Sequence, residues 1–186
     1  MHAMQDERGA PLTVRPLDRE EASPPRARLA GFAIGVAALT LLVDQVSKLW
    51  ALGSLTPGES IEIVGDLLRL TLIRNAGAAF SIGNQATWLL TLVSLAILVV
   101  IVRSIGRLGH RGWALCLGLL LGGAVGNLID RIFREPGVGR GHVIDFIDYG
   151  GLFVGNVADI AIVAAAVTIA VLAWRGIGLD GSRDPR

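Results

Sequence analysis

Long apolar runs separated by polar stretches divide this chain into four hydrophobic segments. A helix rises about 1.5 Å per residue, so about 20 apolar residues cross a hydrocarbon core about 30 Å thick. Runs close to that length occupy residues 29–52, 86–102, 112–129 and 156–174. The pattern predicts four membrane-spanning helices.

The stretch between the first two runs, residues 53–85, has a different pattern. Residues 60–64 and 67–73 alternate between apolar and polar positions, are rich in β-branched side chains and are joined at Gly65 and Asp66. Alternation with turn residues between the runs is typical of short paired strands. We therefore expect an all-α membrane protein of four transmembrane helices with a small β-rich insert between the first and second helices.

The composition supports a membrane protein and argues against several other classes. Hydrophobic residues make up 52% and charged residues 18% of the 186 positions, with a mean hydropathy of +0.58, whereas about a quarter of residues are charged in soluble domains. A net charge of +1 gives no overall field that would attract nucleic acid. Cys116 is the only cysteine, the three histidines are far apart in sequence, and no cofactor motif is recognisable. We expect neither a metal site nor a cofactor.

Lysine and arginine residues are unevenly distributed between the two sides of the predicted bundle. With four spans both termini share a side, and that side carries eleven of them against five on the other. Because positive residues concentrate in the cytoplasm, both termini are expected there and the insert outside. Residues 1–28 are predicted to be a disordered tail, residues 29–175 one transmembrane domain and residues 176–186 a second cytoplasmic tail.

Placing a carboxylate close to the hydrocarbon core of a membrane costs free energy, so each such residue is a candidate for function. All of them fall at the predicted outer end of the bundle: Asp44, Asp130, Asp145, Asp148 and Asp159. Asp44 and Lys48 stand four residues apart on one helix face, so mutual neutralisation is the structural alternative to catalysis.

Two clusters of polar residues lie at the ends of predicted helices. Asn127, Asp130 and Arg131 share one face by their spacing, which fits either a hydrogen-bonded helix end or a site. Asn156 and Asp159 fit an N-cap with a carboxylate at the third helical position. They equally fit a carboxylate that acts on a substrate entering from the lipid. Spacing alone leaves both interpretations open.

The run at residues 112–129 also carries a stripe of glycines at every fourth position, Gly118, Gly122 and Gly126. Small residues at this spacing let a second helix approach closely. We assign this stripe to helix packing rather than to chemistry.

Polar residues also follow the last predicted strand of the insert. Arg74 and Asn75 could donate hydrogen bonds to carbonyl groups. A serine nucleophile activated by Lys48 is a different chemistry. Ser47 is adjacent to Lys48 but points about 100° away from it on a helix, whereas Ser81 could reach it through space.

Taken together, the polar motifs resemble one family. In chain order they are Asp44-Gln-Val-Ser-Lys48, Arg74-Asn-Ala-Gly-Ala-Ala-Phe80, Gly122-Gly-Ala-Val-Gly-Asn-Leu-Ile-Asp-Arg131, Gly141-His-Val-Ile-Asp-Phe146 and Asn156-Val-Ala-Asp159. Their order and composition closely resemble the lipoprotein signal peptidases, also called signal peptidase II. The resemblance covers residues 29–174, and five ordered motifs on a four-span frame make it specific.

The resemblance implies an intramembrane aspartyl peptidase of the bacterial cytoplasmic membrane, with its site toward the outer face. It implies removal of the signal peptide from prolipoproteins, just before the Cys that carries a diacylglyceryl group. By motif, the catalytic pair is Asp145 and Asp159. The matching supporting and substrate-binding positions are Asp44, Lys48, Arg74, Asn75, Asn127, Asp130, Arg131 and Asn156. We expect a monomer whose other partner is membrane lipid.

Two carboxylates held close together provide a chemistry that needs no metal. They do not both ionise readily, so one keeps a proton while the other acts as a base toward water. The water attacks the scissile carbonyl, and the second carboxyl protonates the carbonyl oxygen and then the leaving amine. Either carboxyl can hold the first proton, because coupled groups titrate as a pair.

The chain departs from the family pattern at two points. An aromatic residue usually comes directly before the asparagine of the last helix, but here Val154 and Gly155 separate Phe153 from Asn156. The spacing from Asp145 to Asp159 is also short, which implies a reduced loop over the site.

Three other classes of function compete with a peptidase that uses two aspartates. A small transporter would relay protons through acids spread across the membrane depth, but here they gather at one side. A purely structural subunit would not need several polar motifs converging at one interface. A Ser–Lys peptidase would depend on Lys48 and a serine, and not on Asp145.

Overall fold

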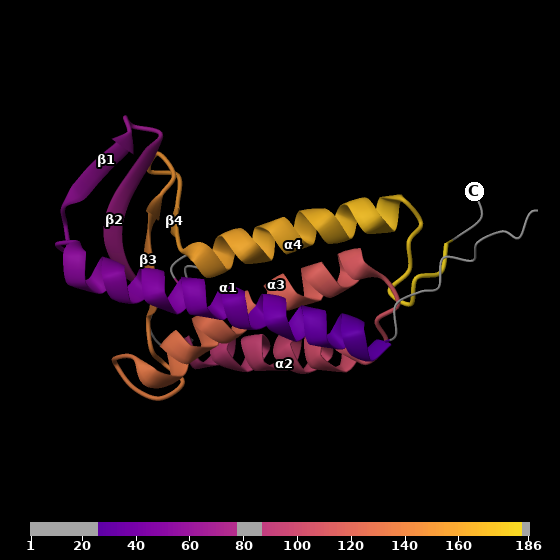
Figure 1. Cartoon of the computed structure of the whole chain (residues 1–186). Coiled ribbons are helices and arrows are strands. Elements are labelled where there is room, and N and C mark those ends of the chain that lie inside the picture. Colours follow the sequence, from indigo (N-terminus) through magenta and orange to yellow (C-terminus); the bar gives the residue numbers. More distant parts are fainter. Residues whose placement is uncertain (1–25, 78–86, 184–186) are drawn as a thin grey trace, which may run out of the picture.

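The computed structural model of the chain describes residues 26–77 and 87–183 (Figure 1). Its helices are α1 (Arg26–Ser54), α2 (Thr87–Ile105), α3 (Arg111–Phe133) and α4 (Val157–Trp174). Its strands are β1 (Ser60–Val64), β2 (Leu68–Asn75), β3 (Val143–Asp148) and β4 (Val154–Gly155). All four helices are long and apolar enough to cross a membrane, which confirms the four predicted spans.

The ends of the helices differ from those predicted by hydropathy. The third helix was expected to stop at residue 129, but α3 continues to Phe133, so Asp130 and Arg131 lie within its last turns. The first helix begins earlier than expected, at Arg26. Hydropathy misses these turns because they carry charged residues that remain helical. Residues 1–25 of the predicted tail and residues 78–86, just before α2, lie outside the described residues.

Helix α3 packs against α1, α2 and α4 and forms the centre of the bundle (Figure 1). The glycine stripe faces α1, as the sequence predicts: a Cβ at Gly118 would lie 2.6 Å from the carbonyl oxygen of Ala33. A Cβ at Gly122 would lie 2.6 Å from that of Ala37. The two backbones therefore touch along the stripe, where no larger side chain fits.

The strands form one antiparallel sheet in the order β1-β2-β3-β4 at one end of the bundle (Figure 1). This corrects the expected fold, because the sheet is not confined to the insert between the first two helices. Its strands β3 and β4 come from the glycine-rich loop after α3, for which no strand was predicted. Strand β3 is buried along almost its whole length, so it lacks the alternation that marks a half-exposed strand.

Pairing of β2 with β3 determines which polar residues of the two strands lie side by side. The register sets Asn75 opposite Val143 and Ile73 opposite Asp145. A cluster of buried side chains joins this sheet to the end of α1: Ala51, Leu55, Leu72, Ile144 and Phe146. The strand that carries Asp145 is therefore packed directly against the helix that carries Asp44 and Lys48.

The C-terminal segment is docked at the opposite end of the bundle. The amide of Gly109 donates to the carbonyl of Leu179 at 2.9 Å, and the indole of Trp113 donates to the carbonyl of Ile177 at 3.0 Å. Residues 177–183 of the predicted tail thus fold back onto the turn between α2 and α3.

Candidate active site

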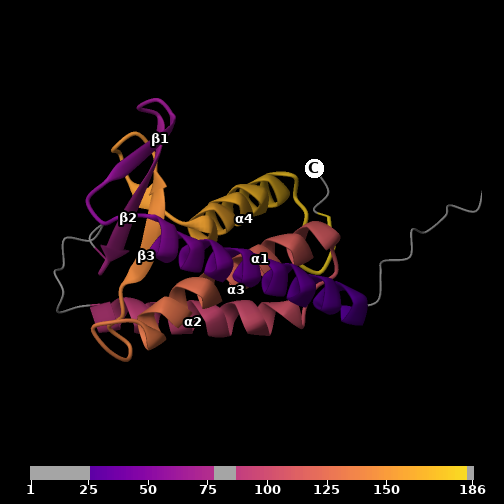
Figure 2. The same ribbon diagram turned by 60° about the vertical axis from the view of Figure 1, so that its left-hand side comes forward.

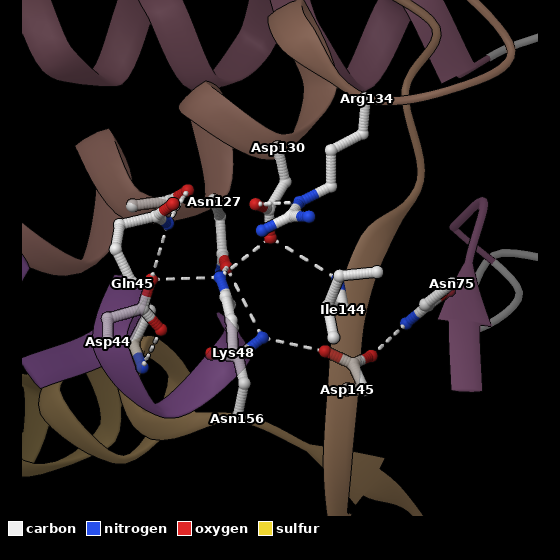
Figure 3. Close-up of polar contacts among 12 residues, drawn as sticks. Asp44, Gln45, Lys48, Asn75, Asn127, Asp130, Arg134, Ile144, Asp145 and Asn156 are labelled. Atoms are coloured by element: carbon white, nitrogen blue, oxygen red, sulfur yellow. Dashed lines mark hydrogen bonds and ion pairs between the residues drawn. The ribbon is translucent and has the colours of Figure 1, made fainter. Parts of the chain in front are cut away.

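A buried lysine lies at the centre of the polar cluster (Figure 3). The Nζ atom of Lys48 is 2.9 Å from Asp44 Oδ2, 2.9 Å from Asp130 Oδ2 and 2.9 Å from Asn127 Oδ1. The side chains of Lys48, Asp44 and Asp130 are completely buried. Three acceptors match the three N–H bonds of an ammonium group. The ion pair of Asp44 with Lys48, the structural alternative considered from the sequence, is present, and Asp130 joins it.

The two carboxylates bound to Lys48 also hold the backbone beside two other aspartates. Asp44 Oδ1 accepts the N–H of Ala158 at 3.0 Å, and Asp130 Oδ2 accepts that of Ile144 at 3.2 Å. Each of these amides belongs to the residue directly before Asp159 or Asp145. Lys48 therefore connects the two contacts that fix the main chain next to those side chains.

Two asparagine side chains join Asp145 to Asp159. Asn156 Nδ2 donates to Asp145 Oδ1 at 2.6 Å and to Asn127 Oδ1 at 3.2 Å. Asn127 Nδ2 donates in turn to Asp159 Oδ1 at 3.1 Å. The carboxylates of β3 and α4 are thus held on one continuous amide network.

The start of α4 also has the predicted capping arrangement. Asn156 is the N-cap, and its side chain accepts the N–H of Asp159 at 3.1 Å. Asp159 Oδ2 in return accepts the N–H of Asn156 at 3.1 Å. Such a reciprocal capping box satisfies free amides at the helix start. The structural interpretation of this pair is confirmed, and the same two side chains also face Asp145 and Asn127.

Asp145 lies on β3 with only 2% of its surface exposed. Burial raises the pKa of Asp145 to about 6, a change that hydrogen bonds from Asn75 and Asn156 oppose and the nearby charge of Asp159 reinforces. The bond from Asn75 Nδ2 to Asp145 Oδ2 measures 2.7 Å, and Asn75 Oδ1 is itself held by the N–H of Gly77. A carboxyl whose pKa lies near neutrality can exchange protons during a reaction.

Arg74 and Asp148 contact other groups instead of the amide network. Arg74 is exposed, and its Nη1 lies 3.4 Å from Glu135. Asp148, on the same strand as Asp145, accepts the N–H of Gly151 and pairs with Arg69 at 3.0 Å. The hydrogen bond from Gly151, followed by Arg69, lowers the pKa of Asp148.

Arg131 lies beside the network with its Nη1 atom buried. Among the described residues, no group accepts a hydrogen bond from that atom.

Several groups that the sequence analysis did not single out complete the cluster. Gln45 Nε2 bridges Asp44 Oδ2 and the carbonyl oxygen of Gly126. Arg134 Nε donates to Asp130 Oδ1 at 2.6 Å. The spacing of Asp130 and Arg134, four residues apart on a helix, was a usable signal, but the helix was expected to end before it.

The serine alternative gains no support from the described contacts. Ser47 Oγ donates to the carbonyl oxygen of Asp44 at 2.8 Å, a contact within its own helix. Ser81, the other candidate, lies outside the described residues. The hydrogen bonds of Lys48 go to carboxylate and amide oxygens instead.

Comparison with known proteins gives consistent matches. Residues 36–175 match the family described as Signal peptidase (SPase) II. The lipoprotein signal peptidase of Mycolicibacterium smegmatis is 45% identical over 177 residues, which cover 94% of this chain and 75% of that protein. The lipoprotein signal peptidase of Rhodococcus jostii is 48% identical over 149 residues, or 80% of this chain and 75% of that protein.

Two solved structures of bacterial membrane enzymes share the fold. One is 27% identical with a TM-score of 0.66 and covers 77% of this chain and 92% of that chain. The other is 26% identical with a TM-score of 0.68 and covers 84% of this chain and 95% of that chain.

Proposed function

This chain belongs to the signal peptidase II family of membrane proteases, and we propose that it cleaves diacylglyceryl-modified prolipoproteins with Asp145 and Asp159. The observation that carries the proposal is the amide network of Asn156 and Asn127, whose side-chain N–H groups donate to both of these carboxylates. Two linked carboxylates are sufficient for the hydrolysis of a peptide bond by activated water.

Asp145 is the acid in this proposal. Burial on β3 raises its pKa to about 6, so it holds a proton at a pH where an ordinary carboxyl is ionised. Asn75 and Asn156 each donate an amide N–H to one of its oxygens and hold the carboxyl in place. Asp159 takes a proton from water as the water oxygen bonds to the carbonyl carbon, and Asp145 gives its proton to the carbonyl oxygen.

Collapse of the resulting diol completes the reaction. Asp159 gives the proton taken from water to the leaving nitrogen, and the C–N bond breaks. A hydroxyl proton of the diol returns to Asp145 as the new carboxyl group forms. Both aspartates end in their starting states.

Lys48 has a positioning role in this mechanism. Its Nζ atom contacts Asp44, Asp130 and Asn127, and none of these partners is a serine that it could activate. The transporter alternative is also not favoured: α1, α3 and α4 each carry one acidic residue near the same end, and α2 carries none.

The decisive experiment uses the purified full chain in lipid or detergent with a diacylglyceryl-modified prolipoprotein. The wild type is expected to cut just before the lipidated Cys, whereas Asp145→Asn and Asp159→Asn lose cleavage while staying folded in the membrane. Asp66→Asn is the matched control, because the Asp66 side chain is 94% exposed in the turn between β1 and β2. Cleavage retained by either variant of the proposed pair would refute the assignment.

A further inference from the structure

We propose that a cleft between the starts of α1 and α3 binds one anionic phospholipid. The cleft has a volume of about 490 Å³. The starts of the two helices that line it lie at the end of the bundle away from the sheet (Figure 1). Its lining residues are Arg28, Leu29, Phe32, Arg111, Gly112 and Leu115. This binding site is separate from the aspartate cluster and does not depend on the proposed proteolysis.

The depth of the two arginines in a membrane follows from helix geometry. Twenty residues separate Arg28 from Lys48 along α1, and twenty separate Arg111 from Arg131 along α3. At about 1.5 Å per residue, each interval spans about 30 Å, which is the thickness of the hydrocarbon core. If the aspartate cluster lies at one membrane surface, Arg28 and Arg111 lie at headgroup level on the other.

The cleft is charged at its rim and apolar further in, as a phospholipid is charged at its headgroup and apolar along its acyl chains. Arg28 and Arg111 are exposed at its rim, and within the described residues neither forms an ion pair with a carboxylate. Phe32 and Leu115 lie four residues deeper on the respective helices and are 49% and 38% exposed. Two guanidinium groups above apolar walls match a phosphodiester above acyl chains.

The apolar walls favour a lipid over a soluble phosphate. Leu29, almost fully buried, forms the floor of the cleft, and its neighbours Phe32 and Leu115 leave apolar surface uncovered. Soluble phosphate would use only the rim, whereas a phospholipid would also cover the apolar surface below it. The leaflet where lysine and arginine gather is the one that attracts anionic headgroups.

The test is native mass spectrometry of the detergent-purified full chain after addition of dioleoyl phosphatidylglycerol. We expect the wild type to retain one such lipid and to retain much less dioleoyl phosphatidylcholine. Each arginine near a membrane surface contributes about fivefold to the binding of an anionic lipid. The double variant Arg28→Gln/Arg111→Gln should therefore bind phosphatidylglycerol about 30-fold more weakly.

The matched control is Arg103→Gln/Arg107→Gln. Both of its arginines are exposed at the same end of the bundle, so the charge changes equally, but neither lines the cleft. Equal losses in the two double variants would overturn the proposal, as would equal binding of phosphatidylcholine. Displacement of the lipid by millimolar inorganic phosphate would also overturn it, since the site would then recognise phosphate alone. A cooperative thermal unfolding transition of each variant, in the same detergent as the wild type, establishes that it is folded.

Discussion

At the scale of single residues, the amide side chains determine how the two proposed catalytic carboxylates differ. Asp145 lies buried on a strand and accepts from Asn75 and Asn156. Asp159 lies in the first turn of a helix and accepts from Asn127 and from the N-cap amide. Different surroundings of this kind separate the roles of two like groups. Which of the two carboxyls holds a proton therefore depends on neutral amide donors as well as on nearby charges.

Activity should depend on pH through Asp145. Its pKa is raised to about 6, so as the acid it loses its proton at higher pH, and kcat/KM should fall as pH increases through about 6. Asn75→Ala removes a donor that stabilises the ionised form, so the pKa should rise further. We expect this limb of the pH profile to move to higher pH by about half to one unit, measured by initial rates of cleavage.

Asn84→Ala is the comparison for Asn75→Ala, although Asn84 lies outside the described residues. Both changes remove an asparagine side chain from the same stretch of sequence. Asn75→Ala should weaken turnover more and should alone move the pH limb. Equal effects of the two changes would argue against a specific contact between Asn75 and Asp145.

At the scale of helices and strands, close approach of α1 and α3 brings the cluster together. The carbonyl oxygens of Ala33 and Ala37 would lie within 2.6 Å of a Cβ at Gly118 or Gly122. A Cβ at the third glycine of the stripe, Gly126, would collide with the carboxylate of Asp44. The packing stripe and the polar cluster are therefore parts of one interface.

Gly122→Ala should push these two helices apart. Its Cβ would meet the Ala37 carbonyl and Thr40 at 2.6 Å, and overpacking of this kind costs about 1–3 kcal/mol. A lower temperature of thermal unfolding in detergent is the expected result. Gly35→Ala on α1 is the control, because a Cβ there meets nothing within 4 Å. Equal melting temperatures would contradict the close packing of the stripe.

Lys48 joins α1 to α3 and, through its two carboxylates, to β3 and α4. Lys48→Met should leave Asp44 and Asp130 buried without their shared cation, a loss worth about 3–5 kcal/mol. The triple variant Asp44→Asn/Lys48→Met/Asp130→Asn removes those charges together and should be less destabilised than the single one. Thermal unfolding of both measures this difference. A single variant that keeps its full stability but loses cleavage would instead favour a chemical role for Lys48.

At the scale of the whole molecule, the bundle has two chemically different ends. The sheet lies at one end of the helices, and the segment after α4 lies at the other (Figure 2). Arg28 and Arg111, near the starts of α1 and α3, are at that second end, where the C-terminal segment is docked. The excess of lysine and arginine on the side of the termini predicts that this second end faces the cytoplasm.

Cysteine labelling in intact spheroplasts tests this orientation. Glu62 on β1 and Arg107 after α2 are both exposed, while the native Cys116 is buried. A membrane-impermeant maleimide should label Glu62→Cys directly and Arg107→Cys only after permeabilisation. The unmodified chain supplies the background from Cys116. Direct labelling of Arg107→Cys with protection of Glu62→Cys would reverse the proposed orientation.

Features set by neighbours in sequence could be predicted from the sequence alone. The four spans follow from hydropathy, the pairing of Asp44 with Lys48 from their spacing, and the capping of α4 from Asn156 and Asp159. Each depends on residues at most one helical turn apart or on a continuous apolar run. Local geometry is sufficient to determine them.

Contacts between distant segments were decided only by the tertiary structure. Asp44 accepts the amide of Ala158, 114 residues away, and Lys48 donates to Asn127, 79 residues away. The sequence of a strand does not indicate which other strand pairs with it. The pairing of β2 with β3, which brings Asn75 to Asp145, was therefore not predicted. The sequence determined which polar groups the membrane domain carries, whereas the packing of α1, α3 and the sheet decided which of them meet.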